Sequence, residues 1–264
     1  MNSISCAARL VFAGCAIVGV TSQAQAIGRV IAVGDEWIVS NNAFALDPVN
    51  TSAFVVNTAN YFTGGGSGNF LVYTHQSQFS GSSFLNTMTT AGHTITVDTA
   101  MPLTLANLLA YDGVFLSGLL GTASGDDAIL ASYVANGGGL FIAGGTGGFF
   151  TAAGEAAAWN PLLNIFGLGF GNEYVPVAGL IDAPLVAGSH PLQSGMTQMV
   201  WGYGQEVIDL DAIPNNVNTV AMHADFSTWQ GSSHYGIVGT YNVPAPAGVA
   251  LLGAAMLGAL RRRR

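Results

Sequence analysis

Positive charge is nearly missing from this chain. It has no lysine, and its six arginines stand against fourteen acidic residues, for a formal net charge of −8. Every acidic residue lies between Asp35 and Asp225, a stretch without a single lysine or arginine. Nucleic acids are bound mainly through Lys and Arg, and anionic lipid headgroups attract the same residues. We therefore predict that the body of the protein binds neither nucleic acid nor an anionic lipid surface.

Cysteine is missing from all but the first fifteen residues, where Cys6 and Cys15 lie. If that segment is removed, disulfides, thiolate metal sites and a cysteine nucleophile are excluded. Charged residues make up only 8% of the chain, so the surface must be built from small neutral polar groups. Such a surface suits a secreted or cell-surface protein better than a cytosolic enzyme.

The first 26 residues have the three parts of a secretory signal peptide in the correct order. Arg9 supplies a positive n-region, and residues 10–20 form an apolar h-region. Ala24 and Ala26 are the small residues that signal peptidase reads. The alternative is a buried N-terminal helix. We predict that residues 1–26 are a signal peptide and that the protein is exported.

Residues 243–264 have a similar organisation at the other end. Pro244 and Pro246 fix φ and lack an N–H, so this segment is neither regular helix nor central strand. The fourteen apolar residues 247–260 would be about 21 Å long as a helix, and snorkelling and local thinning would let them span a membrane. Terminal arginines mark the cytoplasmic side and place the body in the periplasm. These membrane-stop charges are Arg261, Arg262, Arg263 and Arg264.

This tail resembles the PEP-CTERM family of sorting signals, which combine a Pro-x-Pro motif, a short transmembrane helix and an arginine cluster. Ala245 replaces the glutamate of the common motif. The residues that match a known variant are Val243, Pro244, Pro246 and Ala247. The resemblance implies cleavage near the motif by an exosortase, in a Gram-negative bacterium that makes an exopolysaccharide matrix or biofilm. A plain C-terminal membrane anchor is the alternative.

Residues 27–242 are predicted to form one α/β domain. Short apolar runs alternate with helix-like stretches of about ten residues, which is typical of βαβ units and a mainly parallel, doubly wound sheet. The predicted strands are 30–33, 70–73, 94–97, 114–116 and 140–143, and the predicted helices are 52–61, 83–90, 103–111 and 126–135. Three further runs have no helices between them and predict antiparallel strands toward the C-terminus. These runs are 199–210, 217–223 and 235–241.

The same order resembles the glutamine-amidotransferase-like, flavodoxin-related α/β fold. The stretches that carry the resemblance are Gly28–Asp35, Leu109–Leu116, Ile129–Gly144 and His190–Leu192 with Gly195. In that fold the catalytic cysteine lies in a Gly-x-Cys-x-Gly turn after a central strand. Residues 144–148 read Gly-Gly-Thr-Gly-Gly, with Thr146 at the nucleophile position. Amidotransferase activity is therefore not implied, and a tight βα turn or an anion-binding turn are the readings left open.

The candidate pocket lies at the carboxyl ends of the strands, where doubly wound sheets bind ligands. Asp35 and Glu36 follow the first strand, His75 follows the second, and Thr146 follows the central strand. We name Asp35, His75 and Thr146 as candidate catalytic residues, and exposed loop residues are the alternative. His223, Asp225 and His234 lack the close spacing of a zinc motif. No metal or cofactor is predicted.

Two functional hypotheses remain. The first is a non-catalytic, exosortase-sorted surface or matrix protein that associates with exopolysaccharide. Its tryptophans could stack on sugars or belong to the core: Trp37, Trp159, Trp201 and Trp229. The second is an exported hydrolase that acts on carbohydrate or amide bonds without a cysteine, through a His–carboxylate pair in a cleft. We favour the first.

Overall fold

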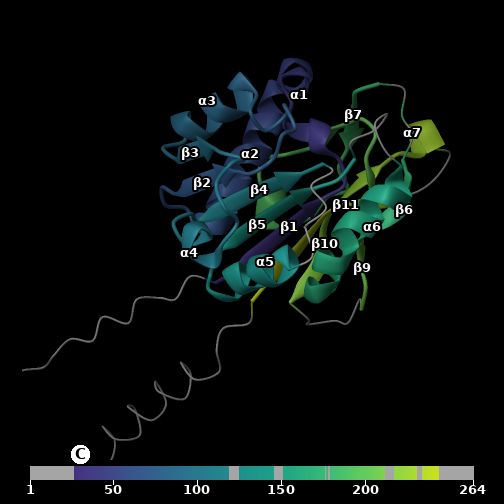
Figure 1. Ribbon diagram of the computed structural model, residues 1–264. Helices are drawn as coiled ribbons and strands as arrows, with labels where there is room; N and C mark the ends of the chain where they lie inside the picture. Colours follow the sequence, from purple (N-terminus) through teal and green to yellow (C-terminus); the bar gives the residue numbers. More distant parts are fainter. Residues whose placement is uncertain are drawn as a thin grey trace, which may run out of the picture.

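A seven-stranded sheet forms the centre of the protein (Figure 1). The computed structural model describes residues 27–118, 125–145, 151–175, 177, 179–211, 217–230 and 234–243. Its parallel strands are β1 (Arg29–Val33), β2 (Asn69–Val72), β3 (Thr94–Val97), β4 (Gly113–Ser117) and β5 (Gly139–Ala143). The antiparallel strands β10 (Asn218–Asp225) and β11 (His234–Asn242) extend the sheet beside β1. The predicted α/β fold, mainly parallel with antiparallel strands toward the C-terminus, is confirmed.

The strand order is β10-β11-β1-β5-β4-β2-β3. Within it, β3-β2-β4-β5 follow the order 2-1-3-4 of a flavodoxin-like sheet. The strand β1 comes first in the chain, yet it is the fifth strand of the sheet when the strands are counted from β3. The carboxyl ends of β1 and β5 are therefore neighbours, and they bring together segments that are far apart in the sequence.

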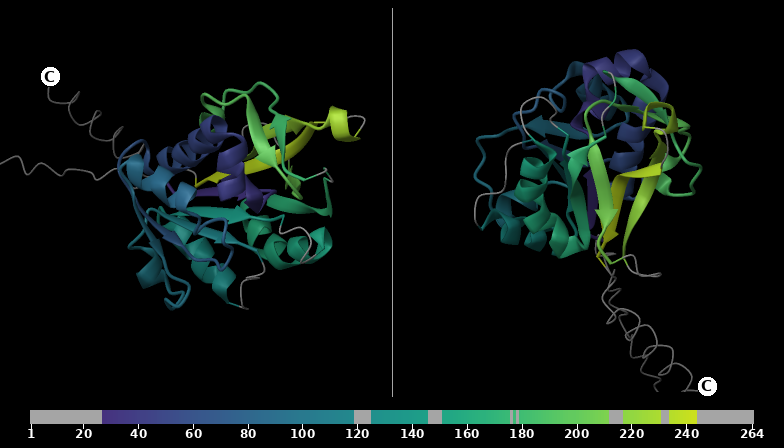
Figure 2. Two further views of the ribbon diagram at one scale, coloured as in Figure 1. Left: turned by 90° about the horizontal axis from the view of Figure 1, so that it is seen from above. Right: turned by 90° about the vertical axis from the view of Figure 1, so that its right-hand side faces the viewer.

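Helices cover both faces of the sheet (Figure 2). One face is covered by α2 (Pro48–Thr63) and α3 (Ser82–Thr90), and the other by α4 (Leu105–Leu108), α5 (Asp126–Ala135) and α6 (Ala152–Leu163). Along β1, Ile31 and Val33 belong to the first core, and Val30 and Ala32 to the second. Strands buried on both faces must be apolar throughout, which is why the sequence shows them as continuous hydrophobic runs.

Short pieces complete the two layers. The β-hairpin of β7 (Ile181–Pro184) and β8 (Gln198–Trp201) packs on the α2 face, and the pair β6 (Leu168–Tyr174) and β9 (Gln205–Asp209) packs on the α6 face. The remaining elements are η1 (Glu36–Val39), α1 (Asn41–Leu46), η3 (Asn164–Phe166), η4 (Pro191–Gln193) and α7 (Ser227–Gln230).

The longest helix, α2, shows how local sequence sets its limits. The Asp47 side chain accepts a hydrogen bond from the N–H of Asn50, and Pro48 occupies the first turn, where its missing N–H costs nothing. Gly64 ends the helix in the left-handed region, with φ of 71°. Phe54, 1% exposed, anchors the helix on the sheet against Phe141, 6.4 Å away between ring centroids.

The sequence predictions differ from the structure in three places. The predicted strand 199–210 is two strands, because the chain turns at Gly202, whose N–H donates to Asp35. The predicted helix 103–111 is reduced to α4. The elements α6, β6 and β7 were not predicted, since α6 is a run of Ala with Pro161 inside and shows little contrast between its faces.

The two described ends of the chain lie side by side. The N–H of Val243 donates to the carbonyl oxygen of Gly28 at 2.8 Å, because β11 runs antiparallel to β1. Both ends therefore leave the body at the amino end of β1, opposite the carboxyl ends of the parallel strands. The predicted signal peptide (Ala24, Ala26) and the sorting residues Pro244, Pro246, Ala247 and Arg261–Arg264 lie outside the described residues. In the described part of the chain, no helix has the length and hydrophobicity to cross a bilayer.

Candidate functional site

Three buried carboxyl groups meet at the carboxyl end of the parallel sheet. Asp35 and Glu36 directly follow β1, and Glu155 lies in the first turn of α6. None is more than 1% exposed. We call these three residues the buried acid cluster. Burying a carboxylate is costly unless it is hydrogen-bonded or becomes protonated, so each of these groups needs a partner or a proton.

Asp35 is fixed by backbone donors. Its Oδ1 accepts from the N–H of Trp37 at 2.9 Å and caps η1, and its Oδ2 accepts from the N–H of Gly202. Burial raises the pKa of Asp35 to about 7, against the lowering effect of the two N–H groups, and the charge of Glu155 adds to the rise. Asp35 therefore exchanges its proton near neutral pH.

Glu36 pairs with the last residue of β4. The hydroxyl of Ser117 donates to Oε2 of Glu36 at 2.5 Å, and Ser117 is itself buried. Burial raises the pKa of Glu36 to about 8, and the nearby charges of Asp35 and Glu155 raise it further, against the hydrogen bond from Ser117. Glu36 is mostly protonated at neutral pH.

Glu155 is the most heavily bonded member of the cluster. Its Oε2 accepts from the N–H of Gly145 at 2.5 Å and from Nε2 of Gln205 at 3.0 Å. Its Oε1 accepts from the hydroxyl of Tyr174 at 2.9 Å. These donors come from the turn after β5, from β9 and from β6, so Glu155 ties the parallel sheet to the β6–β9 layer.

Glycines allow these segments to meet. Gly145 has φ of 78°, and a Cβ there would lie 2.5 Å from the carbonyl oxygen of Gly34 and 2.9 Å from Cα of Asp35. A Cβ on Gly34 would lie 1.8 Å from the carbonyl oxygen of Gln205. Gly145, in the turn after β5, and Gly34 therefore allow close backbone contact at the cluster.

A surface groove borders the cluster at Tyr174. The groove has a volume of about 510 Å³ and is lined by Gly171, Asn172, Glu173, Tyr174, Val175, Glu206 and Tyr235. We call it the aromatic–acid groove. The ring of the exposed Tyr203 stands edge-on to Tyr174, with 6.4 Å between centroids. Because Tyr174 lines the groove and bonds to Glu155, a ligand in the groove would touch a side chain that touches the cluster.

The three residues named from the sequence are placed differently. Asp35 belongs to the buried acid cluster, whereas His75 is exposed after β2. Two strands, β5 and β4, lie between β1 and β2, a separation of about 14 Å at the usual strand spacing. That separation exceeds the reach of proton transfer between Asp35 and His75. Thr146 lies outside the described residues.

The groove and Glu155 of the cluster were missed from the sequence. Glu155 is a single acid in the unpredicted helix α6, and Tyr174 lies in the unpredicted strand β6. Gln205 lies where the predicted strand 199–210 breaks. One signal was available: a lone glutamate in the otherwise uncharged helix sequence AAGEAAAWNPLL.

The tryptophans and histidines that the sequence analysis named lie outside the buried acid cluster. Trp159 and Trp201 are fully buried, so their interpretation as sugar-stacking residues is wrong. His190 caps η4, with its Nδ1 accepting from the N–H of Leu192 at 3.3 Å. Asp225 pairs in register with His234 across β10 and β11. Across the described ranges, no three His, Cys, Asp or Glu side chains are grouped to hold a metal ion.

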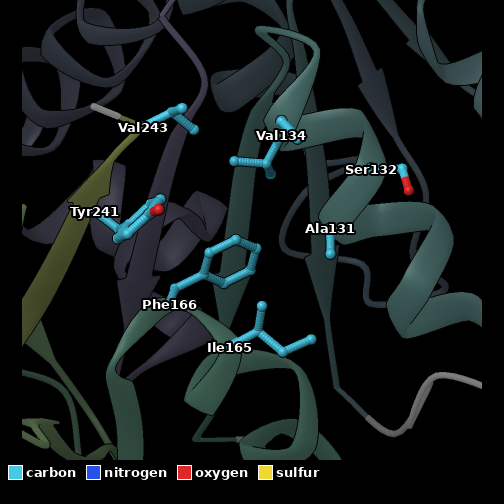
Figure 3. A pocket seen from close by; sticks show the side chains of 8 residues that line it. Ala131, Ser132, Val134, Ile165, Phe166, Tyr241 and Val243 are labelled. Carbon is cyan, nitrogen blue, oxygen red and sulfur yellow. The ribbon is translucent and has the colours of Figure 1, made fainter. Parts of the chain in front are cut away.

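A second hollow lies at the opposite end of the body (Figure 3). It has a volume of about 380 Å³ and lies between α5, η3 and β11. The ring of Phe166 stacks at 5.2 Å from Tyr241, and Val243 forms part of the wall. This hollow is mainly apolar, lies where the chain leaves the body, and lacks a carboxylate in its lining.

The chain matches no protein-family model, and no curated protein or solved structure is significantly similar to it.

Proposed function

We propose that the protein is an exported cell-surface or extracellular-matrix protein of the PEP-CTERM type. Signal peptidase removes residues 1–26, and an exosortase processes the chain near Pro246 in the inner membrane. The body between them is a non-catalytic α/β domain of amidotransferase-like descent that associates with exopolysaccharide. The proposal rests on the two end segments and on the position from which they leave the body.

The observation that carries the proposal is the pairing of Gly28 with Val243. A sorting intermediate held by its C-terminal helix has its membrane at the end where Val243 leaves the body. Tyr235, which lines the aromatic–acid groove, lies seven residues before Asn242 on β11, or about 24 Å away along the strand. The groove therefore lies at the end of the body that is away from the inner membrane in such an intermediate, on the periplasmic side.

The charge of the body supports the same orientation. All fourteen acidic residues lie in the body, and none lies in either end segment. Anionic headgroups repel such a surface, so the body stands off the bilayer while the arginine tail stays on the cytoplasmic side. The two ends and the body thus act together in export.

Mass spectrometry of the mature protein from the native envelope and medium tests this proposal. We expect an N-terminus at Ile27 and a C-terminus near Pro246, without the four terminal arginines. Recovery of the intact chain from the cytosol, with both ends uncut, would overturn it. A membrane-bound form that retains Arg264 would leave a plain anchor as the correct reading.

An exported hydrolase is the second candidate, and the buried acid cluster favours it. Carboxyl groups with pKa values raised to about 7 and 8 at the carboxyl end of a parallel sheet are common in catalytic sites. The test is release of reducing ends or free amines from isolated matrix by the purified protein. Release that disappears in Glu155→Gln would establish the hydrolase, and no release in either form would exclude it for this material.

A further inference from the structure

We propose that the aromatic–acid groove binds glycan that carries free amino groups, such as chains of glucosamine. The inference deepens the proposed function by naming the class of glycan that the groove binds, and it rests on that function only for the place where the protein meets the glycan. The groove combines carboxylates for an ammonium group with aromatic rings for a sugar face.

Charge selects among the saccharides. Glu173 and Glu206 both line the groove, and its lining contains no lysine or arginine. Among the described residues the single arginine is Arg29, the first residue of β1, which lies over the ring of Tyr61 at 4.7 Å. Phosphorylated or uronic-acid polymers would meet two carboxylates and no counter-charge, whereas an ammonium group gains charge-assisted hydrogen bonds.

The histidine His223, beside the groove, does not cancel this charge. His223 on β10 faces Glu206 and His234. Burial lowers the pKa of His223, and the neighbouring His234 lowers it further, against the opposite effect of Glu206. His223 is therefore largely neutral at pH 7 and adds little positive charge beside Glu206.

Aromatic rings supply the second part of the recognition. Tyr174 and Tyr235 line the groove, and Tyr203 stands beside them with 47% of its surface exposed. Aromatic faces pack against the C–H groups of sugar rings and attract ammonium groups through cation–π contact. Because Tyr203 is exposed and lies next to the groove, it extends the aromatic surface along a glycan chain instead of enclosing one small molecule.

The groove is held in place before a ligand arrives. The hydroxyl of Tyr174 is fixed by Glu155, and the N–H of Val175 donates to the carbonyl oxygen of Gly204 at 2.7 Å. These contacts fix the end of β6, which carries Glu173 and Tyr174. Fixed side chains lose little conformational entropy on binding, so the entropic cost of binding a ligand is smaller. The volume of about 510 Å³ is within the range of small-ligand sites.

Calorimetry with defined oligosaccharides tests the inference. The full chain in a non-ionic detergent is titrated with hexamers of glucosamine, N-acetylglucosamine and a uronic acid. We expect binding of the glucosamine hexamer alone. Because a hydrogen bond to a charged group is lost, Glu173→Gln or Glu206→Gln should weaken its Kd about tenfold. The matched control Asp98→Asn removes one carboxylate at the opposite edge of the sheet, after β3, and should leave Kd within twofold.

Three results would overturn the inference. They are equal binding of the acetylated hexamer, no binding of the glucosamine hexamer, and equal weakening by Asp98→Asn and Glu206→Gln, which would indicate attraction to the net charge alone. Circular dichroism of each variant confirms that it is folded, and Glu173, which is exposed, serves if Glu206→Gln fails to fold. Correct export and trimming without glycan binding would sink this inference and leave the proposed function standing.

Discussion

The hydroxyl of Tyr174 donates a hydrogen bond to Oε1 of Glu155 at 2.9 Å, and so joins the aromatic–acid groove to the buried acid cluster. Glu155 in turn accepts from Gly145 and Gln205, beside Asp35. A substitution of either residue therefore affects both the groove and the cluster. The stability of the carboxyl end of the sheet and the geometry of the groove depend on the same bond.

Replacing Tyr174 by Phe should destabilise the protein by about 1–3 kcal/mol. The ring stays, but a buried carboxylate loses a donor, and hydrogen bonds to charged groups contribute about this much. Urea unfolding of the mature protein measures the change. Tyr203→Phe removes a hydroxyl from an exposed side chain and should alter the free energy of unfolding by no more than about 0.5 kcal/mol. Equal effects of the two variants would contradict the structural role of the Tyr174 bond.

Stability should fall as the pH rises from about 4 to about 8. The folded pKa values of Asp35 and Glu36, about 7 and 8, lie above the ordinary values of 3.8 and 4.5, so the folded protein binds more protons than the unfolded chain in this range. Their stabilising contribution is complete below about pH 4 and is lost as the pH passes the folded pKa values. Since one pKa unit corresponds to about 1.4 kcal/mol, the loss should reach roughly 4 kcal/mol for each of the two acids.

Urea midpoints measured between pH 4 and pH 8 check this dependence. Glu36→Gln mimics the protonated acid and keeps an acceptor for Ser117, so it should flatten the slope. Glu173→Gln is the matched control, because Glu173 is exposed and its change should leave the slope as it is. A free energy of unfolding that rises over this range would show that the two acids are ionised in the folded protein.

Gly145→Ala should destabilise the protein more than Gly92→Ala. Both glycines have positive φ, 78° and 89°, so both variants carry the backbone cost of about 1 kcal/mol. Only at Gly145 would the new Cβ press on other backbone atoms, those of Gly34 and Asp35, whereas at Gly92 it would meet open space. We expect a difference of about 2 kcal/mol or more by thermal unfolding. Similar losses would mean that the cluster tolerates expansion.

Replacing both Pro244 and Pro246 by Ala should block trimming of the C-terminus. The proposed exosortase site needs the extended segment that the two prolines impose, and alanine lets the apolar helix continue toward the body. Immunoblots and mass spectra of envelope fractions should then show a chain that retains Arg261–Arg264. Pro102→Ala, in a loop of the body, is the control and should be trimmed normally. Normal trimming of the double variant would refute recognition through the proline pair.

Most of the parallel strands were predictable because β1, β2, β4 and β5 are short apolar runs buried on two faces. The strand 94–97 was predicted with its observed limits, and 30–33 and 140–143 within one residue. The helix 126–135 was also predicted as it is, from its acidic first turn and its glycine end. The helix α6, a run of Ala with Pro161 inside, and the strand β6 were missed, and they carry Glu155 and Tyr174.

The sequence by itself determined the α/β class, and it alone predicts the two end segments on which the export proposal rests, because hydrophobic runs, prolines and charges act locally along the chain. Only the tertiary structure decided that Asp35, Glu36 and Glu155 form one cluster, that two strands separate β1, which precedes Asp35, from β2, which precedes His75, and that Gly28 and Val243 leave the body together. The physical reason is the strand order. Because β1 lies between β5 and β11, residues that are distant in the chain become neighbours, and local sequence patterns do not predict that order.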